Sequence, residues 1–104
     1  MDFLVRIDAT RVYELPADDH NDLVERERDR GRELMADGVL RRLWTLPGKR
    51  ANIGLWSAPD ADTLVEALNS LPIRPYVDID VTALATHPLS AEQAPRTTPV
   101  TGQP

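Results

Sequence analysis

An alternation of apolar and polar residues near the start of the chain predicts its first strand. A period of two is typical of a strand with one buried face. The alternating positions are Phe3, Val5 and Ile7 against Arg6 and Asp8. The residues up to Tyr13 are expected to prolong this strand. Pro16 and the acidic pair Asp18 and Asp19 then mark the start of a helix.

That helix is predicted from about Asp19 to Ala36, and Gly38 follows at the place where a left-handed residue commonly ends a helix. Two β-rich runs come next, VLRRLWTL and ANIGLWS. The residues between them are Pro47, Gly48, Lys49 and Arg50. A Pro-Gly turn between two such runs predicts a hairpin.

A second helix is predicted by an apolar stripe at helical spacing, formed by Leu64, Ala67, Leu68 and Leu71. Ser57 and Asp60 have the spacing of a capping box at its start, and Pro72 ends it. Residues 76–84, YVDIDVTAL, return to the period of two. They predict the last strand.

The resulting order, β-α-β-β-α-β, predicts an α+β, ferredoxin-like subunit in residues 1–90, with an antiparallel sheet and both helices on one face. The other face needs a cover. We expect the sheet of a second subunit there, as in a dimeric α/β barrel. Residues 91–104 are rich in Pro, Thr and Gln and are expected to be disordered.

Composition narrows the possible partners. The chain has 104 residues, enough for one domain, and its net charge of −5 argues against nucleic acid or an anionic membrane surface as partner. No apolar run approaches the ~20 residues of a membrane span, and a signal-peptide layout is missing, so a cytoplasmic protein is expected. A domain this small is expected to gain burial as a homo-oligomer.

Glu27 is the unusual residue of the first helix. A helical wheel places it within an apolar stripe, whose members are Leu23, Val24, Gly31, Leu34 and Met35. Burial raises the pKa of a carboxyl toward the range that suits a general base. Gly31 lies one turn further on the same face and leaves space for a small ligand.

A structural role for Glu27 competes with this interpretation. Glu27 could lie at the edge of the stripe or form an ion pair with one of four arginines, namely Arg28, Arg30, Arg41 or Arg42. The hairpin turn adds Lys49, Arg50 and Asn52, which could hold an anionic ligand with a carbonyl group, although such turn cations are commonly just solvated.

The sequence offers no metal site and no sign of a cofactor. It has no cysteine. His20 and His87 are both expected at the surface, and neither has acidic residues at ligand spacing. Trp44 and Trp56 are expected in the core or an interface.

Two longer segments carry a family resemblance. The runs GVLRRLWTLPGKRANIGLW and LNSLPIRPYVDIDVTALATHPLS resemble muconolactone isomerases in order, spacing and turn chemistry over residues 1–90. The resemblance implies a ferredoxin-like subunit that dimerises through its sheets, a decamer, and a reaction of the β-ketoadipate pathway of aromatic breakdown. In that reaction muconolactone becomes 3-oxoadipate enol-lactone without a cofactor.

The resemblance also implies roles for individual residues. The family's helix-one glutamate aligns with Glu27, which would move the proton, and Asn52 or a backbone N–H is the candidate donor to the dienolate oxygen. Lys49 and Arg50 are the candidates for holding the substrate's carboxylate, and Arg28 and Ile53 complete the expected substrate-binding residues. The family usually has His-Tyr in place of Lys49-Arg50 and an aromatic residue in place of Ile53, which implies a more cationic pocket here.

Two other functions remain open from the sequence. The chain could be a ligand-binding or structural dimer that has kept the fold and lost the activity, as the changed turn suggests. It could also be a lactone dehalogenase or a monooxygenase on the same fold.

Overall fold

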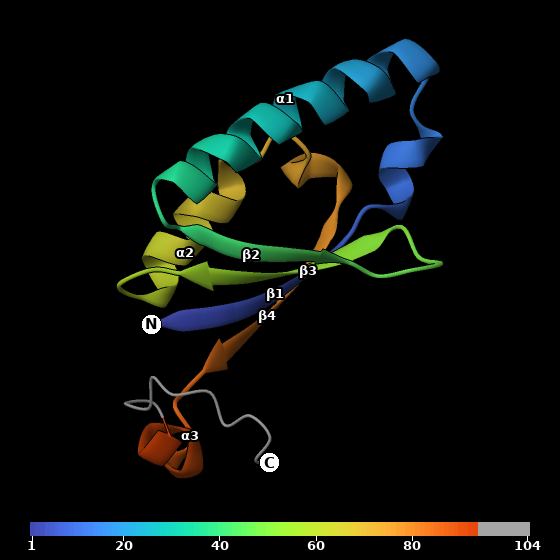
Figure 1. Ribbon diagram of the computed structural model, residues 1–104. Helices are drawn as coiled ribbons and strands as arrows, with labels where there is room; N and C mark the ends of the chain where they lie inside the picture. The colour runs from blue at the N-terminus through green and yellow to red at the C-terminus, as the bar shows by residue number, and fades with distance from the viewer. Residues whose placement is uncertain (94–104) are drawn as a thin grey trace.

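A computed structural model describes residues 1–93 of the chain. Four strands form one antiparallel sheet in the order β2-β3-β1-β4 (Figure 1). The strands are β1 (Asp2–Asp8), β2 (Leu40–Thr45), β3 (Ala51–Ser57) and β4 (Asp78–Leu84). The helices are α1 (Ala17–Ala36), α2 (Ala61–Asn69) and α3 (Pro88–Gln93), with short 3-10 helices η1 (Thr10–Glu14) and η2 (Arg74–Tyr76).

The core lies between one face of this sheet and the two longer helices. On β1 every second residue is buried, and the pairing with β3 places Trp56 opposite Phe3 and Asn52 opposite Ile7 on the same face. These strands share one buried cluster with residues of both helices, Leu23 and Leu34 from α1 and Leu64 and Leu68 from α2. Both helices therefore pack on one face, which confirms the predicted ferredoxin-like subunit.

The chain after β1 differs from the prediction. The strand ends at Asp8, and the residues up to Tyr13 form η1 instead of continuing it. The Asp8 carboxylate accepts a hydrogen bond of 2.9 Å from the backbone N–H of Thr10, a local turn that competes with a strand. The turn lets Val12 enter the core.

The cap of α2 and the start of β4 also differ. Asp60, not Ser57, caps α2, and its carboxylate accepts a hydrogen bond of 2.7 Å from Thr63 N–H. Ser57 is the last residue of β3. Strand β4 begins at Asp78 and not at residue 76, because Tyr76 is the last residue of η2 and Val77 follows as its C-cap.

The end of α1 agrees with the prediction, whereas the structure after β4 does not. Gly38 has a φ of 78°, the left-handed conformation predicted after α1. The short helix α3 was not predicted and lies beyond the end of β4, apart from α1 and α2 (Figure 1). Residues 94–104, most of the predicted disordered tail, lie outside the described residues.

The face of the sheet turned away from the helices carries apolar side chains. Leu4, Ile53 and Leu55 are partly buried there, and Trp44 is 42% exposed with the Arg42 guanidinium 5.1 Å from its ring centre. Cover by a second subunit stays a prediction for this face. Within residues 1–93, no helix is both long and apolar enough to cross a membrane.

Candidate active site

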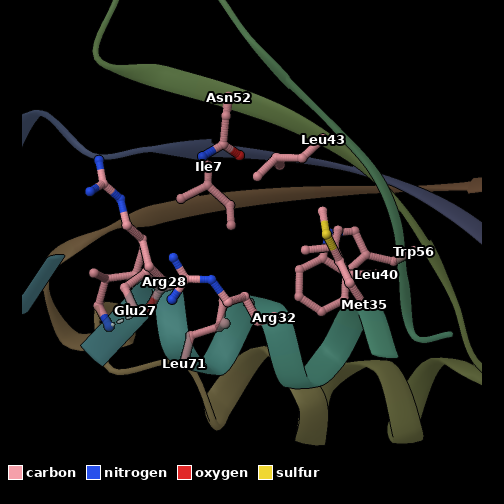
Figure 2. A pocket seen from close by; sticks show the side chains of 12 residues that line it. Ile7, Glu27, Arg28, Arg32, Met35, Leu40, Leu43, Asn52, Trp56 and Leu71 are labelled. Atoms are coloured by element: carbon pink, nitrogen blue, oxygen red, sulfur yellow. Dashed lines mark hydrogen bonds between the residues drawn. The ribbon is translucent and has the colours of Figure 1, made fainter. Parts of the chain in front are cut away.

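A cavity of about 270 Å³ lies between α1 and the helix-facing side of the sheet. Figure 2 shows side chains from both layers pointing into it. Its lining comprises Ile7, Glu27, Arg28, Gly31, Arg32, Met35, Leu40, Leu43, Asn52, Trp56, Leu71 and Ile73. A cavity of this size is suited to a small organic molecule rather than a large cofactor.

The cavity has a polar end and an apolar end. Glu27, Arg28 and Asn52 lie toward one end, and Met35, Leu40, Leu43 and Trp56 gather at the other (Figure 2). The polar groups come from α1 and β3, two elements fixed by the core. A ligand with one polar and one apolar part fits this distribution.

Glu27 lies on the buried side of α1, as its place in the apolar stripe predicts, and is partly buried. Its Oε1 accepts a hydrogen bond of 3.1 Å from the backbone N–H of Ile73, in the loop between α2 and η2. Burial raises the pKa of the Glu27 carboxyl, and the Ile73 N–H opposes this rise in part.

The competing ion-pair interpretation can be checked directly. Within residues 1–93, Glu27 has no cationic side chain within 4.0 Å, whereas Arg30 pairs with Glu33 at 2.8 Å and Arg26 with Asp22 at 3.0 Å. The carboxylate therefore faces the cavity without direct neutralisation. This arrangement is typical of a functional base.

Gly31 and Asn52 border the same cavity. A Cβ built on Gly31 would meet nothing within 4 Å, so open space lies beside Glu27 one helical turn away. Asn52 points from β3 toward α1 (Figure 2), and its Oδ1 is buried without a hydrogen-bond partner among the described residues. An amide oxygen without a partner can bind a ligand. Rotation of the amide group by 180° would place the donor Nδ2 where the acceptor Oδ1 now lies.

Two arginines extend from α1 over this cavity. Arg28 makes no ion pair within residues 1–93, and Arg32 pairs with Asp29 at 2.9 Å. Arg28 was predicted as a substrate-binding residue from the sequence, but Arg32 was not. Its spacing of four from Arg28 was the available signal, since residues four apart share a helix face.

Three predicted substrate-binding residues lie elsewhere in the subunit. Lys49 and Arg50 are exposed in the hairpin turn, and the Arg50 guanidinium lies 4.1 Å from the ring centre of Tyr13. Ile53 is on the opposite face of the sheet, next to Arg6. None of the three lines this cavity.

No group of three or more His, Cys, Asp or Glu side chains is placed to hold a metal ion in the described part of the chain. The polar side chains that line this cavity carry carboxylate, amide and guanidinium groups. Such groups can move a proton, donate hydrogen bonds and hold an anion.

Comparison with known proteins decides the family. A family model described as muconolactone delta-isomerase matches residues 1–90. The chain belongs to this family. It is 34% identical to the muconolactone delta-isomerase of Cupriavidus pinatubonensis over 88 residues, covering 85% of this chain and 96% of the relative.

Other relatives and one solved structure agree. The muconolactone delta-isomerase of Acinetobacter baylyi is 33% identical, with 85% of this chain and 92% of the relative covered. A crystal structure of muconolactone isomerase superposes with a TM-score of 0.75 at 32% identity, over 85% of this chain and 92% of that one. The predicted resemblance is confirmed, and the chain is an isomerase of the muconolactone delta-isomerase family.

Proposed function

We propose that this isomerase converts muconolactone to 3-oxoadipate enol-lactone by moving one proton, with Glu27 as the only base and without a cofactor. The observation that carries the proposal is a partly buried carboxylate, with a raised pKa and no paired cation among the described residues, at the polar end of a ligand-sized cavity. The names of the relatives supply the substrate.

The reaction needs one proton to leave one carbon and one proton to reach another. The Glu27 carboxylate takes the proton from the ring carbon that bears the carboxymethyl arm, and the electron pair delocalises through the double bond onto the lactone carbonyl oxygen. The carboxyl group then returns a proton to the carbon next to the carbonyl. The double bond has shifted, and Glu27 is again a carboxylate.

The dienolate formed between these two steps carries negative charge on oxygen. Asn52 faces the cavity from β3, opposite α1, and its buried amide has no partner for Oδ1 among the described residues. With its Nδ2 turned into the cavity, the amide donates a hydrogen bond to the dienolate oxygen. A fixed donor of this kind stabilises charge that develops during a reaction.

The substrate's free carboxylate needs a cation, and Arg28 borders the cavity without an ion pair among the described residues, unlike Arg32, which pairs with Asp29. Lys49, Arg50 and Ile53 stay predictions for substrate binding. None of these three residues lines the cavity of its own subunit. If they bind substrate, they do so in the cavity of a neighbouring subunit. We propose a homo-oligomer, at least a dimer through the open sheet face and a decamer by family resemblance, acting in the cytoplasm in the β-ketoadipate pathway.

Turnover separates this function from the alternatives. Purified protein is mixed with muconolactone, and loss of substrate and formation of enol-lactone are followed by proton NMR. The proposal predicts catalytic turnover without added metal or cofactor. Binding of muconolactone without turnover would contradict it and favour a binding protein, and release of halide from a halogenated lactone instead would favour a dehalogenase.

A further inference from the structure

A second cavity, of about 200 Å³, borders the other side of Glu27. Its lining consists of Ala9, Val12, Tyr13, His20, Val24, Glu27, Arg28 and Ile73. Three of these residues, Glu27, Arg28 and Ile73, also line the first cavity. Glu27 therefore stands at the junction of two cavities, and the proposed reaction so far uses only one of them.

His20 brings an unsatisfied polar atom to the second cavity. Its Nε2 is buried and has no hydrogen-bond partner within residues 1–93. The ring is held from two sides, because its Nδ1 lies 3.3 Å from Asn21 Oδ1 and its centre lies 4.9 Å from that of Tyr13. A buried nitrogen without a partner costs free energy, and a ligand that pairs with it removes that cost.

The contact with Asn21 leaves Nε2 as the ring nitrogen that is open to a ligand. The Asn21 oxygen can only accept, so Nδ1 carries a hydrogen in this contact. With both ring nitrogens carrying hydrogen, Nε2 donates to an anionic oxygen such as that of a carboxylate. Glu27 also faces this cavity and repels an anion, so the charge of Arg28 is needed beside the His20 donor.

We propose that the second cavity binds the carboxylate of the substrate's carboxymethyl arm, with His20 and Arg28 as its donors, while the lactone ring occupies the first cavity. The inference rests on the proposed function. It explains the place of Glu27, because the carbon that loses its proton is the one that joins ring and arm. With ring and arm in different cavities, that carbon lies at the junction.

The test compares two lactones. One is muconolactone, and the other carries a methyl group in place of the carboxymethyl arm. His20→Leu is expected to lower kcat/KM for muconolactone about 10- to 100-fold, the range for losing a hydrogen bond to a charged group. The change should lie mainly in KM. The methyl lactone should lose less than about 3-fold, because it has no carboxylate to hold.

Control variants separate the binding role from a structural one. His87→Leu changes the other histidine, which is exposed, and should leave both lactones unaffected. If His20→Leu does not fold, His20→Gln keeps an N–H donor and should give a smaller loss confined to muconolactone. Equal losses on both lactones, or no loss on muconolactone, would overturn the inference.

Binding measurements keep this test separate from the proposed function. The saturated lactone with a carboxymethyl arm cannot isomerise, and calorimetry gives its Kd. The inference predicts that His20→Leu weakens its binding about 10- to 100-fold, even if the protein turns over no lactone. An unchanged Kd would refute the role of His20 and leave the proposed isomerase reaction standing.

Discussion

Replacing Glu27 by glutamine should affect stability and activity in opposite directions. The pKa of the Glu27 carboxyl is raised above its ordinary value of 4.5 by burial, so folding favours the protonated form. The wild type therefore has this contribution to stability in full below pH 4.5, and loses it as pH rises through the raised pKa. Glu27→Gln does not titrate and should not show this loss.

The size of the hydrogen-bond contribution follows from the Ile73 contact. In Glu27→Gln the amide oxygen can still accept the 3.1 Å hydrogen bond from Ile73 N–H. In Glu27→Ala that buried N–H loses its partner, at a cost of about 1–3 kcal/mol. For a domain of this size the cost lowers Tm by roughly 4–20 °C relative to Glu27→Gln.

Thermal and urea unfolding of the three proteins at pH 4 and pH 7 measures both effects. All samples need the same protein concentration, because an oligomer's stability depends on it. The expected order at pH 7 is Glu27→Gln at or above wild type, with Glu27→Ala lowest. If Glu27→Gln were clearly less stable than wild type at pH 7 and equal to it at pH 4, the carboxylate would be a stabilising ion, and the account of its burial would be refuted.

Three further substitutions test separate parts of the structure. Asn52→Leu removes the buried unpaired Oδ1, so it should keep or raise Tm while lowering kcat about 10²- to 10³-fold; a normal kcat would exclude Asn52 as the dienolate donor. Gly54→Ala should cost about 1–3 kcal/mol in urea unfolding, since its Cβ would come within 2.7 Å of Trp56 Nε1 and 3.3 Å of Leu40 Cδ1; unchanged stability would show that Trp56 can shift. Asp60→Ala should lower Tm through loss of the α2 cap, whereas Ser57→Ala should lower it less, and the reverse order would contradict the assigned cap.

The order of elements could be predicted because each main element has its own periodicity and its own stop signal. Gly38 marks the end of α1, and Pro47-Gly48 marks the turn between the two strands of the hairpin. Both positions agree with the structure. Local turns were harder to predict. The Asp8 carboxylate ends β1 by bonding Thr10 N–H, a contact that competes with continued strand pairing and has no periodic signature.

The residues of the candidate site also differ in how far the sequence predicts their surroundings. Glu27 could be found from one helix alone, because a carboxylate in an apolar stripe breaks the expected pattern. The surroundings of His20 could not, because η1 brings Tyr13 against its ring and turns a predicted surface residue into a partly buried one. The exclusion of Lys49 and Arg50 from the cavity lining likewise depends on where the hairpin turn lies in three dimensions.

The kcat of Glu27→Gln with muconolactone tests the role of Glu27 as the base most directly, with Glu25→Gln as matched control. Glu25 is an exposed glutamate of α1, so both variants remove one negative charge from the same helix. Glu27→Gln is expected to lower kcat about 10²- to 10⁴-fold, the range for losing a general base, and Glu25→Gln is expected to match wild type. Equal kcat values for Glu27→Gln and wild type would remove Glu27 from the reaction.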